Sequence, residues 1–205
     1  MKRLLTLSLA ALLAAALTGC GARGAKPVIY LYPEEETQVS VTLELDGTFT
    51  STYPDYGEGW TVNAAPDGTL TDPDTGRTYY CLFWEGIIDR QFDLSAGFCV
   101  AGEDTAAFLE NALARLGLTE REANEFIIYW LPRMEGNPYN LISFQTDAYT
   151  DAAELTIDPA PDTLIRVFMA WKGLERPVEI PAQELTAPAR TGFTAVEWGG
   201  AELGK

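Results

Sequence analysis

The sequence predicts an α+β domain, mostly β, in which an antiparallel sheet or sandwich carries an inserted helical hairpin at about residues 103–132. Two observations lead to this prediction. Most of the chain alternates apolar and polar residues, which is the period of strands with one buried face. One segment instead has the three-to-four-residue apolar spacing of amphipathic helices. Strands that flank a pair of helices are typical of this class.

The segments before residue 103 are predicted to be strands. Residues 38–45, QVSVTLEL, alternate strictly, and a turn at Asp46-Gly47 precedes the alternating TFTSTY, so residues 38–53 are expected to form a hairpin. GWTVNA is a further strand, and short strands frame the turns at Asp67-Gly68 and in DPDTG. Residues 78–86, TYYCLFWEG, are apolar on both faces, which predicts a central strand covered on both sides.

The next segment is predicted to form two helices. Apolar residues from 104 to 116 fall on one helical stripe, and Gly117 suits the end of that helix. Thr119 and Glu122 have the spacing of a capping box, which opens a second helix that Pro132 is expected to end. Strands then resume at NLISFQ, TLIRVFMAW and GFTAVEWGG.

The N-terminus has the pattern of an export signal. Lys2 and Arg3 precede an apolar run, Leu4–Leu17, which is too short to span a bilayer as a helix. The tail Leu-Thr-Gly-Cys, ending at Cys20, resembles the lipobox of bacterial lipoproteins. That resemblance implies cleavage before Cys20 and a diacylglyceryl group on its sulfur. The alternative is an ordinary secretory signal in which the cysteine is incidental.

These features predict the domain organisation and the location. Residues 1–19 are expected to be a lipoprotein signal peptide, 20–27 a short tether and 28–205 a single globular domain. The protein is expected at the cell membrane, lipid-anchored on its extracytoplasmic face. The membrane, through the lipid on Cys20, is therefore one expected partner.

Charge and composition restrict the other partners. Without residues 1–19 the chain has 12 basic and 30 acidic residues, a net charge of −18, which disfavours nucleic acid as a partner. Carbohydrate, peptide and basic-protein partners remain compatible with this charge. The chain has no histidine and no Gly-rich phosphate loop, so no metal and no cofactor is predicted. DPDTG matches only part of a calcium loop and is interpreted as a turn.

The two remaining cysteines leave two alternatives open. Cys81 and Cys99 lie in the apolar contexts YYCLFW and GFCVAG. They either pair in an oxidising envelope or sit in the core as separate thiols.

Aromatic and polar residues gather in three stretches, FWEG, YWLPRMEGNPYN and VEWGG. If these stretches converge, they form a cleft with flat rings for sugar faces and with amides and carboxylates for hydroxyl groups. A binding or interaction module is the favoured function. The alternative is a glycosidase-like envelope hydrolase that uses Glu85 and Glu197 as paired carboxylates. The candidate cleft residues are Trp84, Glu85, Tyr129, Trp130, Asn137, Tyr139, Asn140, Glu197 and Trp198.

An ordered set of motifs carries a wider resemblance. KPVIYLYP, YCLFWEG, FIIYWLP, NLISF, RVFMAW and GFTAVEWGG together resemble an uncharacterised family of secreted and lipid-anchored bacterial proteins with related fungal sequences. The resemblance extends from about residue 26 to residue 200. It implies a single domain, and it assigns no catalytic residue.

Overall fold

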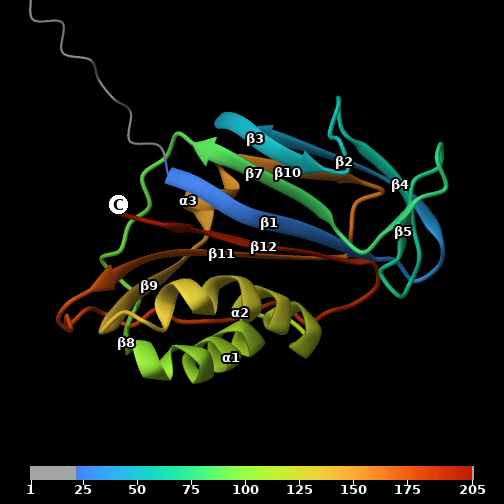
Figure 1. The fold of residues 1–205 in the computed structure, drawn as a ribbon. Helices are drawn as coiled ribbons and strands as arrows, with labels where there is room; N and C mark the ends of the chain where they lie inside the picture. The colour runs from blue at the N-terminus through green and yellow to red at the C-terminus, as the bar shows by residue number, and fades with distance from the viewer. Residues whose placement is uncertain (1–21, 205) are drawn as a thin grey trace, which may run out of the picture.

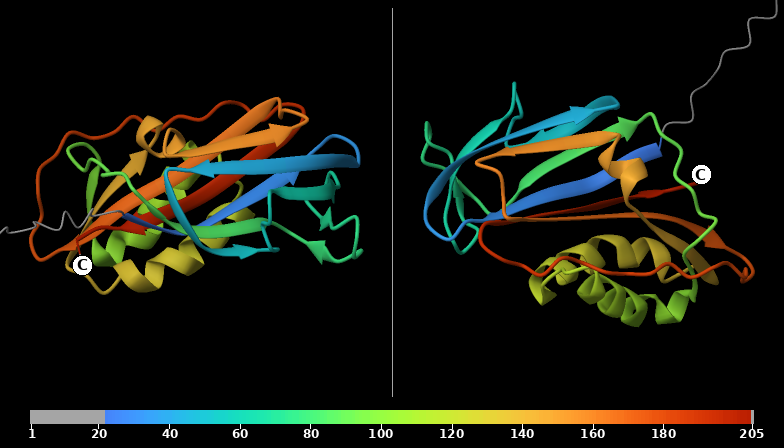
Figure 2. Two further views of the ribbon diagram at one scale, coloured as in Figure 1. Left: turned by 90° about the horizontal axis from the view of Figure 1, so that it is seen from above. Right: turned by 180° about the vertical axis from the view of Figure 1, so that it is seen from behind.

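The computed structural model describes residues 22–204 as three stacked layers. A seven-stranded sheet forms the middle layer, two helices cover one of its faces, and a five-stranded sheet covers the other (Figure 1). The view from behind in Figure 2 shows the same order of layers. The predicted α+β class, mostly β with a helical hairpin, is confirmed.

The middle layer contains strands from the whole length of the described chain. Its order is β3-β7-β1-β12-β11-β9-β8, and every neighbouring pair is antiparallel except β11 and β12, which are parallel. The first and last strands in sequence pair at the centre of this sheet. In chain order the strands are β1 (Ala22–Tyr32), β3 (Gly47–Tyr53), β7 (Leu82–Ile88), β8 (Phe98–Ala101), β9 (Tyr139–Gln145), β11 (Thr163–Leu174) and β12 (Thr194–Glu202).

The second sheet is antiparallel throughout, with the order β10-β2-β4-β5-β6. Its longest strand alternates buried and exposed residues, as QVSVTLEL predicts. DPDTG forms the turn between its two shortest strands, where the Asp72 carboxylate accepts the backbone N–H groups of Asp74 and Thr75. The strands are β2 (Thr37–Leu45), β4 (Trp60–Ala64), β5 (Leu70–Thr71), β6 (Thr78–Tyr79) and β10 (Ala153–Asp158).

The helical hairpin forms as its capping signals predict. Thr119 and Glu122 make both reciprocal hydrogen bonds of a capping box. The prediction that Pro132 ends the second helix is wrong, because that helix continues to Met134 with Pro132 inside its last turn. The helices are α1 (Thr105–Arg115), preceded by a 3-10 turn (Gly102–Asp104), α2 (Glu120–Met134) and the short α3 (Asp147–Thr150).

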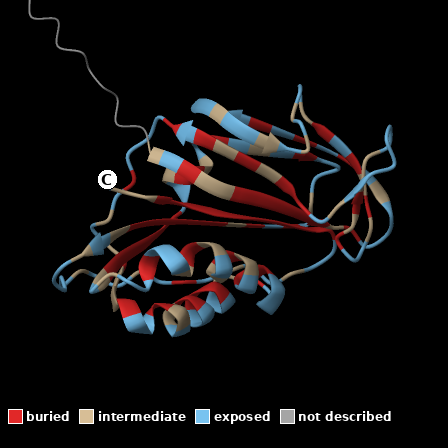
Figure 3. Cartoon of the chain, in the orientation of Figure 1, coloured by how far each residue is buried: buried red, intermediate tan, exposed pale blue. Residues whose placement is uncertain are grey.

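Two apolar cores hold the three layers together. One lies between the sheets and includes Leu31, Val41 and Phe168. The other lies between the middle sheet and the helices and includes Leu113, Phe126 and Trp198. Figure 3 shows buried positions along the central strands and on the sides of α1 and α2 that face the sheet. The middle sheet is therefore apolar on both faces where both layers cover it.

The predicted hairpin over residues 38–53 is wrong. β2 pairs with β10 and β4 in the second sheet, whereas β3 pairs with β7 in the middle sheet. The chain changes sheets at Asp46, whose backbone N–H and C=O bond to Ala152 and Asp89. Gly47 then has a φ of +154°, and a Cβ there would lie 1.9 Å from the Ile87 carbonyl oxygen. Only glycine permits this close approach of the two strands.

The boundary predicted between tether and domain also differs. β1 begins at Ala22 and pairs with β7 from Ala22 and with β12 from Ala25, so residues 22–27 belong to the sheet and not to a tether. The predicted signal peptide and Cys20 lie outside the described residues. Among residues 22–204, no helix has the length and apolarity needed to cross a membrane.

Candidate functional site

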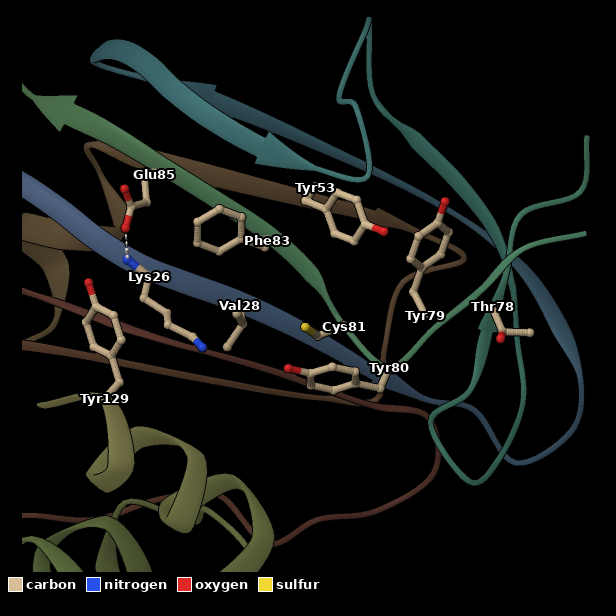
Figure 4. A pocket seen from close by; sticks show the side chains of 10 residues that line it. All are labelled: Lys26, Val28, Tyr53, Thr78, Tyr79, Tyr80, Cys81, Phe83, Glu85 and Tyr129. Atoms are coloured by element: carbon tan, nitrogen blue, oxygen red, sulfur yellow. Dashed lines mark hydrogen bonds between the residues drawn. The ribbon is translucent and has the colours of Figure 1, made fainter. Parts of the chain in front are cut away.

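A groove of about 510 Å³ lies on the helix-facing side of the middle sheet, beyond the edge of α2. Its floor is formed by β1 and β7, and Tyr129 of α2 forms part of one wall. Figure 4 shows Glu85 and Tyr129 at one end, tyrosines at the other end, and Lys26 and Phe83 between them. The lining residues are Lys26, Val28, Tyr53, Thr78, Tyr79, Tyr80, Cys81, Phe83, Glu85 and Tyr129.

The groove exists because β7 is covered fully on one face only. Leu82, Trp84 and Ile88 point into the core between the sheets, whereas Phe83 and Glu85 are half-buried on the opposite face. The prediction of a strand covered on both sides is therefore wrong for β7. It is second from the edge of its sheet, and the helices pack mainly against strands nearer the opposite edge.

Aromatic rings dominate the exposed lining. Tyr53 and Tyr80 are each 50% exposed. The Tyr53 ring stands edge-on to the Tyr79 ring, with 5.5 Å between centroids. Burial raises the pKa of Tyr129, so its phenol stays protonated and can donate a hydrogen bond. The groove thus presents flat apolar faces together with hydroxyl groups.

Glu85 is held in place at one end of the groove. Its carboxylate accepts the backbone N–H of Lys26 at 3.3 Å and lies 3.5 Å from the guanidinium of Arg23. The Lys26 ammonium lies 5.5 Å from the centre of the Tyr129 ring. A carboxylate and an ammonium group are therefore both positioned beside the aromatic surface.

Only two of the predicted cleft residues line this groove, namely Glu85 and Tyr129. The three predicted tryptophans are in the cores. Trp84 lies between the sheets, while Trp130 and Trp198 lie between the middle sheet and the helices. Each is at most 1% exposed, so their rings pack almost entirely against protein, and none of them lines this groove.

The predicted polar residues of YWLPRMEGNPYN have structural contacts. The buried Asn140 amide donates to the Thr105 hydroxyl and to the Met134 carbonyl, which joins β9 to α1 and to the end of α2. Asn137 in turn donates to the Asn140 side-chain oxygen. Tyr139 is half-buried at the start of β9. These three residues lie outside the groove lining.

Glu197 forms a buried ion pair between the sheets. Its carboxylate accepts Arg166 Nε at 2.7 Å and Trp84 Nε1 at 3.0 Å, and it is fully buried. The Arg166 guanidinium lies 4.8 Å from the Tyr149 ring centre. Burial acts to lower the pKa of Arg166, but Glu197 and Tyr149 together outweigh it, and the net pKa is raised. Arg166 therefore stays charged.

Glu85 and Glu197 lie on opposite faces of the middle sheet. Glu197 contacts Trp84, which points between the sheets, whereas the neighbouring Glu85 points into the groove. Successive side chains of a strand alternate between faces, so these two carboxylates cannot approach one substrate from the same side. The paired arrangement that a glycosidase needs is not formed by these residues.

The two cysteines are free thiols at distant places in the sheet. Cys81 precedes β7, Cys99 lies in β8, and β1, β12, β11 and β9 separate these strands. Five steps of about 4.8 Å give about 24 Å, far beyond the 7 Å limit between Cα atoms in a disulfide. The disulfide alternative is therefore excluded within one molecule.

Thiol titration tests this arrangement. The chain from Gly21 onward, unfolded in guanidinium without reductant, is expected to show two reactive thiols, whereas a disulfide would leave none. Burial, with a smaller contribution from Glu125, raises the pKa of Cys81 to about 12. In the folded protein at about pH 8, Cys81 is therefore expected to alkylate much more slowly than after unfolding.

Sequence reasoning missed Lys26 and four of the five aromatic residues of the groove, namely Tyr53, Tyr79, Tyr80 and Phe83. The run RTYYCLFW could have indicated the groove in part. It places aromatic residues on both faces of a strand, and one of those faces is exposed to solvent. Among residues 22–204, no cluster of three or more acidic or cysteine side chains is arranged to hold a metal ion.

Comparison with known proteins gives one informative relative. The chain is 42% identical over 85 residues to a Butyrivibrio fibrisolvens protein described as an uncharacterized protein in the bglA 3′ region. The match covers 37% of this chain and 86% of that protein. No family model matches the sequence, and no solved structure matches it. At this identity and coverage, the chain belongs to the same family as the Butyrivibrio protein.

Proposed function

We propose that this protein is a saccharide-binding module of the cell envelope, held at the outer side of the membrane through Cys20. The observation that supports binding is the groove, in which exposed tyrosine rings lie beside Lys26 and Glu85. Flat rings complement the apolar faces of pyranoses, and hydroxyl, ammonium and carboxylate groups complement their hydroxyls. The lipobox-like sequence that ends at Cys20 supports the location.

A saccharide suits the groove better than an extended peptide. Peptides often bind by adding a strand to an open sheet edge, where backbone groups are free. The two strands of the groove floor have no such edge, because β7 pairs with β3 and β1, and β1 pairs with β7 and β12. Recognition on the groove floor therefore depends on side chains, and five of the ten lining residues are aromatic.

Binding is favoured over hydrolysis for a related reason. Glu85 is the one acidic residue among the residues that line the groove. Glycosidases usually need two carboxylates that flank the scissile bond. A hydrolase would require a second acid from elsewhere, and Glu197 lies on the other side of the sheet.

The groove is tested by removing its two most exposed rings. In the double variant Tyr53→Ala/Tyr80→Ala we expect affinity for a bound oligosaccharide to fall about 30-fold, since each ring buries about 50 Å² and contributes about 1 kcal/mol. Binding is measured by calorimetry with oligosaccharides identified on an array of glycans and peptidoglycan fragments. The control is Ile128→Ala, which removes a 74%-exposed apolar side chain from α2 outside the groove lining.

Two results would count against this function. One is an array on which the folded protein binds no saccharide. The other is binding that the double variant retains at full strength, since it would place the ligand away from the groove.

A further inference from the structure

A second cavity continues the groove past Glu85 and Tyr129. It has a volume of about 350 Å³ and shares those two residues with the groove. Its other lining residues are Arg23, Ala25, Trp130, Arg133 and Glu202. The two cavities together form one extended site along β1, aromatic at one end and rich in arginine at the other.

Cations stack on the aromatic rings along this site. The Arg133 guanidinium lies 4.0 Å from the Tyr129 ring centre, and the Lys26 ammonium lies 5.5 Å from the same centre. At the other end the Arg77 guanidinium lies 5.9 and 5.8 Å from the ring centres of Tyr53 and Tyr79. Cation–π contacts of this kind orient a charged group without neutralising its charge.

Within residues 22–204, no salt bridge of 4.0 Å or less joins the three stacked cations to a carboxylate. Ion pairs within 4.0 Å join Arg90, Arg121, Arg166 and Arg190 to acids, but none involves Lys26, Arg77 or Arg133. Arg23 contacts Glu85 at 3.5 Å, yet its side chain remains 69% exposed.

The extended site therefore differs in sign from the rest of the molecule. Its lining holds three basic side chains, Arg23, Lys26 and Arg133, against the two acids Glu85 and Glu202, and the Arg77 guanidinium stacks on two of its tyrosines. The whole chain has 14 basic and 30 acidic residues. A local excess of positive charge on such an acidic protein indicates a negatively charged ligand.

We propose that the ligand is an acidic saccharide, whose rings stack on the tyrosines while its carboxylate or sulfate groups pair with these cations. This inference rests on the proposed saccharide-binding function. Cations stand at both ends of the site and at Lys26 between them, so the complementary ligand is an oligosaccharide charged at more than one residue. The arginine forks suit carboxylate and sulfate oxygens, and both charge types are carried by acidic polysaccharides.

The test compares acidic oligosaccharides with their own neutral forms. The probes are an oligogalacturonate and its methyl ester, an oligoglucuronate and its methyl ester, and a sulfated oligosaccharide and its desulfated form. We expect at least one acidic probe to bind the chain from Gly21 onward about tenfold more tightly than its neutral form at low salt. The difference is expected to shrink as salt is added. Comparison of the carboxylate probes with the sulfated probe shows which of the two anionic groups the site binds.

Matched variants locate the effect. Lys26→Gln/Arg133→Gln is expected to reduce the affinity for the acidic probe about tenfold and the affinity for the neutral probe by a much smaller factor. Glutamine keeps a hydrogen-bond donor for hydroxyl groups at both positions, whereas each exposed charge pair that is lost contributes up to about fivefold. Arg115→Gln/Arg176→Gln removes the same charge from exposed positions outside both cavities and is expected to have little effect. Circular dichroism confirms that each variant is folded.

The outcomes separate the two proposals. Equal binding of acidic and neutral forms would overturn the acidic ligand and leave the saccharide-binding function intact. Absence of binding to every saccharide would overturn both. Tighter binding of an acidic peptide such as oligoglutamate than of any saccharide would also overturn both, in favour of a peptide ligand.

Discussion

Replacing Glu197 by glutamine is expected to lower the free energy of unfolding by about 3–5 kcal/mol, because it leaves the buried Arg166 without its counter-charge. Glutamine has the shape of glutamate, so the Trp84 hydrogen bond can persist and packing changes little. The Arg166 side chain is 8% exposed and cannot reach water without disturbing the core between the sheets. The lost stability therefore measures the effect of leaving the Arg166 charge unpaired.

Urea unfolding followed by tryptophan fluorescence measures this effect. The double variant Arg166→Met/Glu197→Gln is expected to recover most of the loss, since replacing both ions by neutral groups removes the unpaired charge. The comparison Asp46→Asn breaks an exposed pair with Arg90 and is expected to cost under about 1 kcal/mol. A cost for Glu197→Gln as small as that of Asp46→Asn would contradict a buried, paired carboxylate.

The local structure was predictable wherever neighbouring residues determine it. Strict alternation in QVSVTLEL gives β2, with its apolar side chains in the core between the sheets. Thr119 and Glu122 form their capping box from residues three positions apart, so no distant contact is needed. The class of the fold follows from such local signals.

Strand partners were not predictable, because they depend on contacts distant in sequence. Asp46-Gly47 is a typical hairpin turn, yet the chain there crosses from one sheet to the other. The residues of the turn are equally compatible with a hairpin and with a change of sheet. The change of sheet occurs because β3 pairs with β7 at the edge of the middle sheet. A turn motif determines that the chain reverses direction, but it does not determine which sheet the next strand joins.

The candidate site was also predictable only in part. Glu85 and Tyr129, two of the predicted cleft residues, line one groove in the structure, but Tyr53 joins them only through the pairing of β3 with β7. The tryptophans and Glu197 have the same residue types as a binding cleft, yet the layers bury them. A strand's sequence shows that it has two faces, whereas only the packed layers show which face stays open.

Replacing Cys20 by alanine is expected to move the protein from the membrane fraction to the soluble fraction. Two acyl chains of about 15 carbons would contribute on the order of 20 kcal/mol to membrane binding, and the variant loses both. The mature chain has a net charge of −18, so anionic lipid headgroups repel the remaining domain and release should be complete even at low salt. Cys99→Ala, which removes a thiol within β8, is expected to stay in the membrane fraction.

Fractionation is read together with mass spectrometry of the N-terminus. The native protein is expected to begin at Cys20 with a diacylglyceryl group on its sulfur. Since Gly21 alone separates Cys20 from β1, such an anchor would hold the sheet, and with it the groove, directly at the membrane surface. Unmodified sulfur in native material, or membrane retention of a cleaved Cys20→Ala variant, would refute the anchor. The groove would then serve a protein released from the cell, and its ligand would be sought outside the envelope.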